Sequence, residues 1–241
     1  MVCDFRSRDV AAGGQGAPLV PAFHAETFGR AGQGIAVLNV GGIANLSWLP
    51  PTGSVSGFDC GPGNVLMDFW CQRHQGQSFD AGGRWAASGR VDPGLLQSLM
   101  REPYFSQLAP KSTGRDLFNA AWLGPHLAGA VRRAEDVMAT LLELSVAAAC
   151  EALRHCGSAP AELLVCGGGA FNDELMRRLS ARLEPGTGVY STARYGVAPD
   201  RVEALAFAWL ARSFCERRPA NLPAVTGAAG PRILGALYPA R

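Results

Sequence analysis

Residues 35–49 read IAVLNVGGIANLSWL, and this stretch decides the fold. Its first six residues are apolar and rich in strand formers, the pair Gly41-Gly42 interrupts it, and the apolar pattern resumes at Ile43. Two such runs around a glycine pair are typical of a β-hairpin. A third short strand is predicted at residues 55–58, which ends at Asp59 and leads into a glycine-rich turn. The sheet is therefore expected to begin with three consecutive strands.

Helices and strands alternate after this opening. The predicted helices are residues 65–74, 93–101, 118–123, 136–155, 172–183 and 202–215, and the later strands are 163–166 and 189–192. Antiparallel strands followed by alternating units indicate an α/β fold with a mixed sheet flanked by helices. The first six residues are typical of a strand end, residues 9–18 are a glycine-dense loop, and residues 219–241 are predicted to pack as loop.

The composition is that of a compact globular protein. Hydrophobic residues make up 48% of the 241-residue chain and charged residues 17%. The 22 basic and 20 acidic residues leave a net charge of +2, and no basic run is longer than a pair, so the sequence gives no electrostatic signature of nucleic-acid binding. No apolar run approaches the ~18–20 residues of a membrane helix, so no membrane partner is expected.

The cysteines and the first residues suggest where the protein works. The seven cysteines contain no C-x-x-C pair, which together with the lack of an apolar leader favours reduced thiols in the cytoplasm. We expect most of them to be small buried hydrophobic residues. The opening residues MVCDFR run from a strand-like segment straight into a polar loop, so we expect that preceding sequence is missing.

Three glycine-rich turns are candidates for binding phosphate. They are Gly41-Gly42, the turn at residues 61–64 (GPGN) before a helix, and residues 167–169 (GGG) after a buried strand. Glycine lets backbone N–H groups approach a phosphate closely, and a helix start adds free N–H groups and partial positive charge. A glycine pair alone more often just makes a turn. Neither a P-loop motif nor a dinucleotide-binding fingerprint in its proper context is present.

Asp59 follows an apolar strand and precedes the second of these turns. A carboxylate at the carboxyl end of a strand is well placed to act as a general base on water or a hydroxyl group. The alternative is a cap that accepts backbone N–H groups of the following helix. The residues alone leave both roles open.

Other polar residues carry competing interpretations. Glu203 has the spacing of a capping box with Asp200, which predicts a structural role. The charged cluster that contains Arg8 and Asp9 is suited to bind sugar hydroxyl groups or a carboxylate. The alternative is that it forms a solvated loop. The four histidines lack metal-ligand spacing, so we interpret them as structural or surface residues. Metal ligands stay unknown.

Longer motifs carry a family resemblance. They are residues 4–21 (DFRSRDVAAGGQGAPLVP), 38–45 (LNVGGIAN), 58–64 (FDCGPGN), 110–115 (PKSTGR) and 166–172 (CGGGAFN). In this order they resemble the signature segments of anhydro-N-acetylmuramic acid kinases. The resemblance covers essentially the whole chain, down to the closing LGALYP at residues 234–239.

The resemblance implies a fold of the actin-like, ribonuclease H-like sugar kinase superfamily, in which two similar domains hold ATP in the cleft between them. On this basis residues 1–34 are a remnant of the first domain with a glycine-rich substrate loop. Residues 35–241 are then the C-terminal kinase domain, with a mostly helical insertion around residues 79–135.

The resemblance also implies a reaction and its residues. The family cleaves the 1,6-anhydro bond of its sugar with water and phosphorylates O6 from ATP with Mg2+, which gives N-acetylmuramic acid 6-phosphate in cell-wall recycling. Asp59 corresponds to the base that activates water, and Arg8, Asp9 and Glu203 are assigned to the sugar. The residues assigned to the nucleotide are Asn39, Gly41, Gly42, Gly61, Gly63, Gly167, Gly168, Gly169 and Asn172. The implied partners are the sugar and ATP, and a homodimer stays open.

One departure from the family pattern affects the expected activity. The N-terminal Gly-Thr-Ser-x-Asp-Gly phosphate loop of the family is absent from the 241 residues. Because phosphoryl transfer depends on positioning and charge stabilisation, we expect the chain alone to be a poor kinase. A kinase for another sugar and a non-catalytic sugar-binding fragment are the alternatives.

Overall fold

The computed structural model describes residues 1–239, and its centre is a five-stranded sheet in the order β4-β3-β2-β5-β6. The strands are β2 (Ile35–Val40), β3 (Ile43–Leu49), β4 (Ser56–Pro62), β5 (Glu162–Cys166) and β6 (Gly188–Ser191). Strands β2, β3 and β4 pair antiparallel, whereas β5 pairs parallel with both β2 and β6. The predicted mixed sheet is therefore confirmed.

Strand β4 is longer than the sequence predicted. The expected strand end at Asp59 is wrong, because β4 continues to Pro62. Asp59 pairs with Asn45 of β3, and the register shifts between Ala44 and Asn45. Such a bulge re-aims the side chains beside it. Asp59 therefore lies within an edge strand next to an irregularity, not at the end of the strand.

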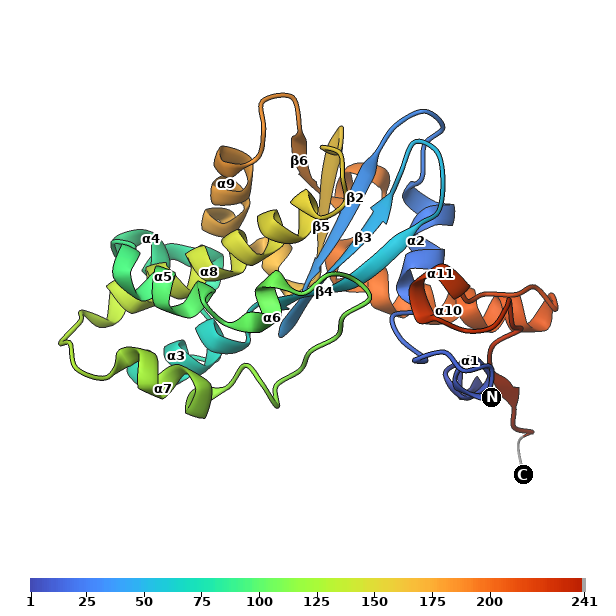
Figure 1. The fold of residues 1–241 in the computed structure, drawn as a ribbon, viewed down its shortest axis with the longest axis horizontal. Coiled ribbons are helices and arrows are strands. Elements are labelled where there is room, and N and C mark those ends of the chain that lie inside the picture. The colour runs from blue at the N-terminus through green and yellow to red at the C-terminus, as the bar shows by residue number, and fades with distance from the viewer. Residues whose placement is uncertain (240–241) are drawn as a thin grey trace.

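Helices cover both faces of the sheet (Figure 1). Helix α8 (Ala134–Arg154) packs in one core cluster with Leu38 of β2, while α2 (Val20–Phe28) and α10 (Val202–Cys215) pack in another with Val37. Neighbouring residues of β2 thus point into different cores. A strand that is buried on both faces is a continuous apolar run, which explains the sequence of residues 35–40.

A group of helices lies beside the α8 face. Helix α3 (Val65–Gln75) follows β4, and α4 (Arg84–Ser88), α5 (Pro93–Met100), α6 (Pro103–Ser106) and α7 (Ala120–Leu127) fall within residues 79–135, the predicted insertion; α9 (Asp173–Arg182) follows β5. The start predicted for α7 at residue 118 was too early, because Asn119 Oδ1 accepts the N–H groups of Ala121 and Trp122 and begins the helix there. Helices α4 and α6 were not predicted.

The two ends of the chain meet. Strand β1 (Val2–Cys3) pairs antiparallel with β7 (Ala236–Leu237), and α1 (Ser7–Ala11) lies near α11 (Pro223–Thr226) (Figure 1). Within residues 219–239 the prediction of loop holds except at α11 and β7, and the prediction of loop for the start of residues 9–18 is wrong because α1 occupies it. Residues 240–241 lie outside the described residues.

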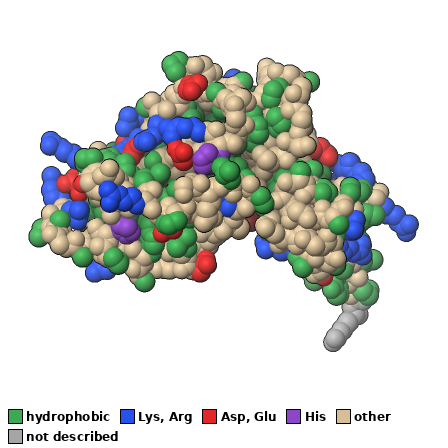
Figure 2. All heavy atoms as spheres, in the orientation of Figure 1, with side chains coloured by type: hydrophobic (Ala, Val, Ile, Leu, Met, Phe, Trp, Pro, Cys, Tyr) green, Lys and Arg blue, Asp and Glu red, His purple; other side chains and the backbone are tan. Residues whose placement is uncertain are grey.

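Helix α2 was also missed, and it ties residues 1–34 to the rest of the chain by packing on β3 and α10. The division at residue 34 stays a prediction. On the face drawn in Figure 2, lysine and arginine side chains fall in several separate groups. Within residues 1–239, no helix has the length and apolar character needed to cross a bilayer.

Candidate active site

A cavity of about 610 Å³ opens where β2 and β5 end. These are two parallel strands, and the crevice beyond the carboxyl ends of such strands is the usual ligand site of α/β sheets. Its lining includes polar residues and glycines from several elements: Arg6, His24, Asn39, Gly41, Asn45, Asp59, Gly167, Gly168 and Glu203. Segments from the beginning, middle and end of the sequence therefore share one cavity.

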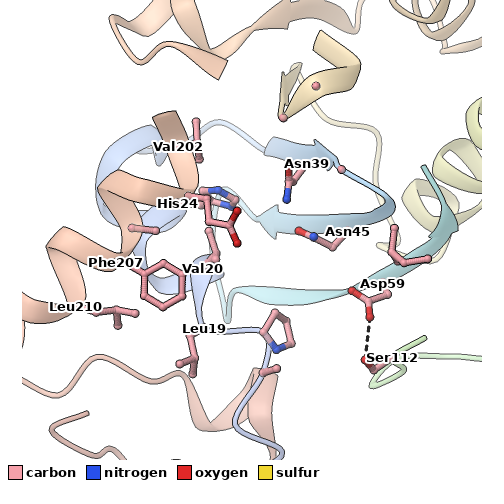
Figure 3. A pocket seen from close by; sticks show the side chains of 18 of the residues that line it. Leu19, Val20, His24, Asn39, Asn45, Asp59, Ser112, Val202, Phe207 and Leu210 are labelled. Carbon is pink, nitrogen blue, oxygen red and sulfur yellow. Dashed lines mark hydrogen bonds between the residues drawn. The ribbon is translucent and has the colours of Figure 1, made fainter. Parts of the chain in front are cut away.

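The cavity has a polar and an apolar side (Figure 3). Asn39, Asn45 and Asp59 reach it from the neighbouring strands β2, β3 and β4, whereas Phe207 and Leu210 reach it from α10. A few convergent polar groups opposite an apolar wall are typical of a small-molecule site.

Asp59 is held in place from several directions. Its Oδ2 accepts a hydrogen bond of 2.8 Å from Ser112 Oγ and one of 3.0 Å from the Thr113 N–H. The backbone N–H of Asp59 donates to Lys111 O at 3.3 Å. The interpretation of Asp59 as a cap for the following helix is wrong, because α3 begins after Asn64 with no side-chain cap.

Glu203 lies in the first turn of α10 and lines the same cavity as Asp59. The predicted capping box is wrong: α10 begins after Arg201 with no side-chain cap, and Asp200 instead lies 3.8 Å from the Arg201 guanidinium. The carboxylate of Glu203 is thus not used to begin its helix and remains available to a ligand.

Two of the three glycine turns reach the cavity. Gly41 comes from the β2–β3 turn, and Gly167 and Gly168 come from the turn after β5. Gly167 has a φ of +75°, and a Cβ there would lie 2.5 Å from Asn39 Oδ1. Only glycine therefore lets the turn after β5 come so close to the end of β2.

The middle turn supports the first one instead. The N–H of Gly63 donates to Gly42 O at 2.9 Å, and the N–H of Asn64 donates to Gly41 O at 2.8 Å. The Gly63 N–H, one of the predicted nucleotide contacts, is thus already hydrogen-bonded within the protein. Four of the glycines assigned to the nucleotide lie outside the lining of the large cavity: Gly42, Gly61, Gly63 and Gly169.

A second cavity of about 370 Å³ adjoins the first, since Gly168 lines both. Phe79 and Phe171 line it with 64% and 57% of their surfaces exposed, so their rings are free to stack on a planar ligand. Asn172 also lines it, while its Oδ1 begins α9 by accepting the Leu175 N–H at 2.9 Å. Burial raises the pKa of Asp68 at this cavity to about 6, against the opposing charge of Arg115.

The charged segment near the N-terminus is placed differently from the prediction. Arg8 lies outside the cavity lining, and its Nη1 donates to Ile233 O at 3.1 Å. Asp9 is fully buried and accepts hydrogen bonds from the Gly16 N–H, Asn221 and Thr226. The member of this segment that lines the cavity is Arg6.

Sequence reasoning missed His24 as a cavity residue. It is fully buried on α2, its Nδ1 lies 2.8 Å from Ser47 Oγ, and its Nε2 has no hydrogen-bond partner within residues 1–239. Burial lowers the pKa of His24 to about 3, so the ring is neutral at pH 7. No signal in the sequence pointed to it, because α2 itself was not predicted.

Residues 1–239 contain no cluster of three or more His, Cys, Asp or Glu side chains that could hold a metal by itself. Magnesium at phosphate-transfer sites commonly uses one or two carboxylates together with substrate phosphates. Asp59, Asp200 and Glu203 all line the large cavity, so the side chains present fit that mode of binding.

Comparison with known proteins places the chain in a family. The model of the family described as anhydro-N-acetylmuramic acid kinase matches residues 1–240. The anhydro-N-acetylmuramic acid kinase of Variovorax paradoxus (strain S110) is 60% identical over 247 residues, which cover 100% of this chain and 65% of that protein. The one from Pseudomonas paraeruginosa (strain DSM 24068 / PA7) is 58% identical, with coverage of 100% and 66%. The chain thus spans just under two thirds of the length of these curated relatives.

A solved structure gives a weaker similarity. The activator of the 2-hydroxyisocaproyl-CoA dehydratase from Clostridium difficile with bound ADPNP aligns with a TM-score of 0.48 and 12% identity, over 85% of this chain and 69% of that chain. Similarity at this level carries no argument about function.

Proposed function

Because the chain belongs to the anhydro-N-acetylmuramic acid kinase family, we propose that its large cavity binds the anhydro sugar and supports water attack and phosphoryl transfer. The observation that carries the proposal is the convergence of Asp59, Glu203, Gly41 and Gly167 on one cavity. The enzyme would act in the cytoplasm during cell-wall recycling, with N-acetylmuramic acid 6-phosphate as its product.

Asp59 is the general base in this proposal. Its carboxylate takes a proton from water while the water oxygen attacks the anomeric carbon of the sugar. The bond from that carbon to O6 breaks, and O6 forms a bond to the γ-phosphorus of ATP as ADP leaves. The proton taken up by Asp59 is afterwards released to solvent, so the products are ADP, the phosphorylated sugar and one proton.

The nucleotide would occupy the second cavity and extend toward the first. This placement is supported by the shared Gly168 and by the exposed rings of Phe79 and Phe171, which suit a planar base. The turns at Gly41 and Gly167 would then lie beside the phosphates. Magnesium, when bound with ATP, would supply charge neutralisation, and Asp200 and Glu203 are the carboxylates within the cavity, apart from the proposed base, that could hold it.

The sugar would lie between the polar and apolar sides of the large cavity. Asn39, Asn45 and Glu203 offer hydrogen bonds to hydroxyl and amide groups, and Arg6 offers positive charge to a carboxylate. Arg8 and Asp9 would act indirectly, by shaping the segment that carries Arg6, in place of the direct contacts expected from the resemblance.

The decisive experiment compares Asp59→Asn with the exposed control Asp116→Asn, in this chain and at the equivalent positions of a full-length relative. We expect Asp59→Asn to lower turnover at least about a thousandfold with nucleotide affinity within about twofold. In 18O-labelled water, the label should appear on the anomeric carbon. Near-normal turnover of Asp59→Asn, or label in the phosphate, would disprove the proposed role of Asp59.

A second comparison concerns the sugar. Glu203→Gln should raise the KM for the anhydro sugar about tenfold with a smaller effect on the KM for ATP, because it removes a charged hydrogen bond. Preference for ordinary hexoses in a panel would favour a kinase for another sugar. We also propose that this chain alone is a poor kinase, and sugar binding without turnover by this chain, beside an active full-length relative, would support that part.

A further inference from the structure

A loop forms a hydrogen bond with the free edge of the sheet at Asp59. Strand β4 is the edge strand, and its other side pairs with β3. On the open side, the Asp59 N–H donates to Lys111 O at 3.3 Å. The loop segment 110–113 therefore continues the hydrogen bonding of the sheet beyond its last strand.

The same loop engages one oxygen of the Asp59 carboxylate. Ser112 Oγ and the Thr113 N–H both donate to Oδ2, at 2.8 Å and 3.0 Å. Within residues 1–239 no hydrogen bond reaches Oδ1. One carboxylate oxygen is thus fixed by the protein and the other is left for a ligand, which is the arrangement that a positioned base requires.

The side chain of Lys111 anchors this loop to helix α6. This side chain is buried, and its Nζ donates to Tyr104 O at 3.2 Å and to Phe105 O at 3.4 Å. The ammonium group also lies 4.7 Å from the centre of the Tyr104 ring and 5.8 Å from that of Phe58. A buried charge with these partners has few alternative positions, so it fixes the backbone of residue 111.

Tyr104 completes the arrangement. Its hydroxyl group donates to Asp59 O at 2.8 Å, so the backbone of Asp59 is bonded through both its N–H and its carbonyl group. Burial lowers the pKa of the Lys111 ammonium group and raises that of the Tyr104 hydroxyl group. Each of these groups depends on its hydrogen bonds to compensate for burial.

We propose that segment 110–113 is a positioning clamp for Asp59, in which Ser112 Oγ and the Thr113 N–H fix one carboxylate oxygen and Lys111 anchors the loop. The inference rests on the proposed function, since Asp59 must be the base for the clamp to affect catalysis. Ser112 and Lys111 are positioning residues, because neither is proposed to touch the reacting atoms.

The contact itself is tested in this chain without any activity. Asp59→Ala removes the acceptor of the Thr113 N–H, and we expect amide hydrogen exchange at Thr113 to become at least about tenfold faster. The Asn64 N–H, which donates to Gly41 O at 2.8 Å, serves as the internal control and should keep its rate. Unchanged exchange at Thr113, or an equal acceleration at both amides, would overturn the clamp.

Its effect on catalysis is tested with the equivalent of Ser112→Ala in a full-length relative. We expect kcat to fall about tenfold with KM values within about twofold, because one hydrogen bond to a charged group is lost. Ser112→Thr, which keeps the hydroxyl group, should restore most of kcat.

The matched control is Ser106→Ala, because the one hydrogen bond of Ser106 Oγ within residues 1–239 goes to the nearby Pro103 O at 2.9 Å. It should leave kcat unchanged, whereas Lys111→Met should lower kcat as Ser112→Ala does. If Asp59→Asn is inactive and Ser112→Ala behaves like the control, the clamp is disproved and the proposed function stands. If Asp59→Asn is active, the proposed function has failed, and the exchange experiment still decides whether the contact exists.

Discussion

Asn221 Nδ2 donates a hydrogen bond of 2.7 Å to Asp9 Oδ1, and this bond joins the first and last segments of the chain. Thr226 Oγ1 donates to the same oxygen at 2.8 Å, and the Gly16 N–H donates to Oδ2 at 2.8 Å. A fully buried carboxylate thus organises the segment that carries Arg6 to the cavity. The cavity wall depends on contacts between residues that are far apart in the sequence.

Asp9→Ala should destabilise the protein by about 2–4 kcal/mol, because it removes the shared acceptor of three hydrogen bonds in a buried network and leaves the Gly16 N–H without a partner. Urea unfolding followed by circular dichroism measures this free energy. Asp200→Ala is the control, since its side chain is 55% exposed, and it should change stability by less than about 0.5 kcal/mol. A loss of less than about 1 kcal/mol in Asp9→Ala would show that the buried network contributes little.

Gly167→Ala should cost about 2–4 kcal/mol of stability, because its φ of +75° is unfavourable for alanine and the new Cβ would lie 2.8 Å from Val40 O. The neighbouring Gly168→Ala is the matched comparison, since its φ is not in the left-handed region and its nearest neighbour, Asn64 Nδ2, is 3.4 Å away. Chemical denaturation of both variants should separate them by more than about 1 kcal/mol. Equal losses would contradict the close approach of the turn after β5 to the end of β2.

His24 should make the protein less stable as the pH falls. The folded-state pKa is lowered from 6.5 to about 3 by burial, so between these values the unfolded state binds a proton that the folded state does not. Stability should therefore fall below pH 6.5 by up to about 1.4 kcal/mol per pH unit. His24→Gln should flatten this slope between pH 6.5 and 4.5, and His155→Gln is the control that should retain it. A slope unchanged in His24→Gln would place the proton uptake elsewhere.

Glu174 should affect the pH dependence of stability at lower pH than His24 does. Hydrogen bonds from Arg177, together with Arg178, lower its pKa from 4.5 to about 2, so its contribution is complete above pH 4.5 and is lost as the pH falls to 2. Glu174→Gln should remove on the order of 2 kcal/mol of this acid-sensitive stability. Free energies of unfolding measured from pH 5 to pH 2 test this, with the exposed Glu184→Gln as control. Parallel curves for wild type and Glu174→Gln would refute it.

Local sequence patterns were enough to predict most strands of the sheet and the long helices. The run at residues 35–49 predicted the β2–β3 hairpin, and the apolar stripe of residues 136–155 predicted α8. Both signals arise from side-chain periodicity and glycine punctuation, which are properties of a short window. The family motifs likewise lie in continuous segments, so the family could be recognised from sequence and is confirmed by the comparisons.

What the sequence alone determined was therefore the mixed sheet, the positions of its glycine turns and the family. Only the tertiary structure decided that Ser112 bonds Asp59, that Arg6 and not Arg8 reaches the cavity, and that Glu203 does not begin its helix through a cap. The pairing of β1 with β7 was likewise visible only in the tertiary structure. Most of these contacts join residues far apart in the chain. Even at the start of α10, where Asp200 and Glu203 are close in sequence, the competing partners are selected only once the chain has folded.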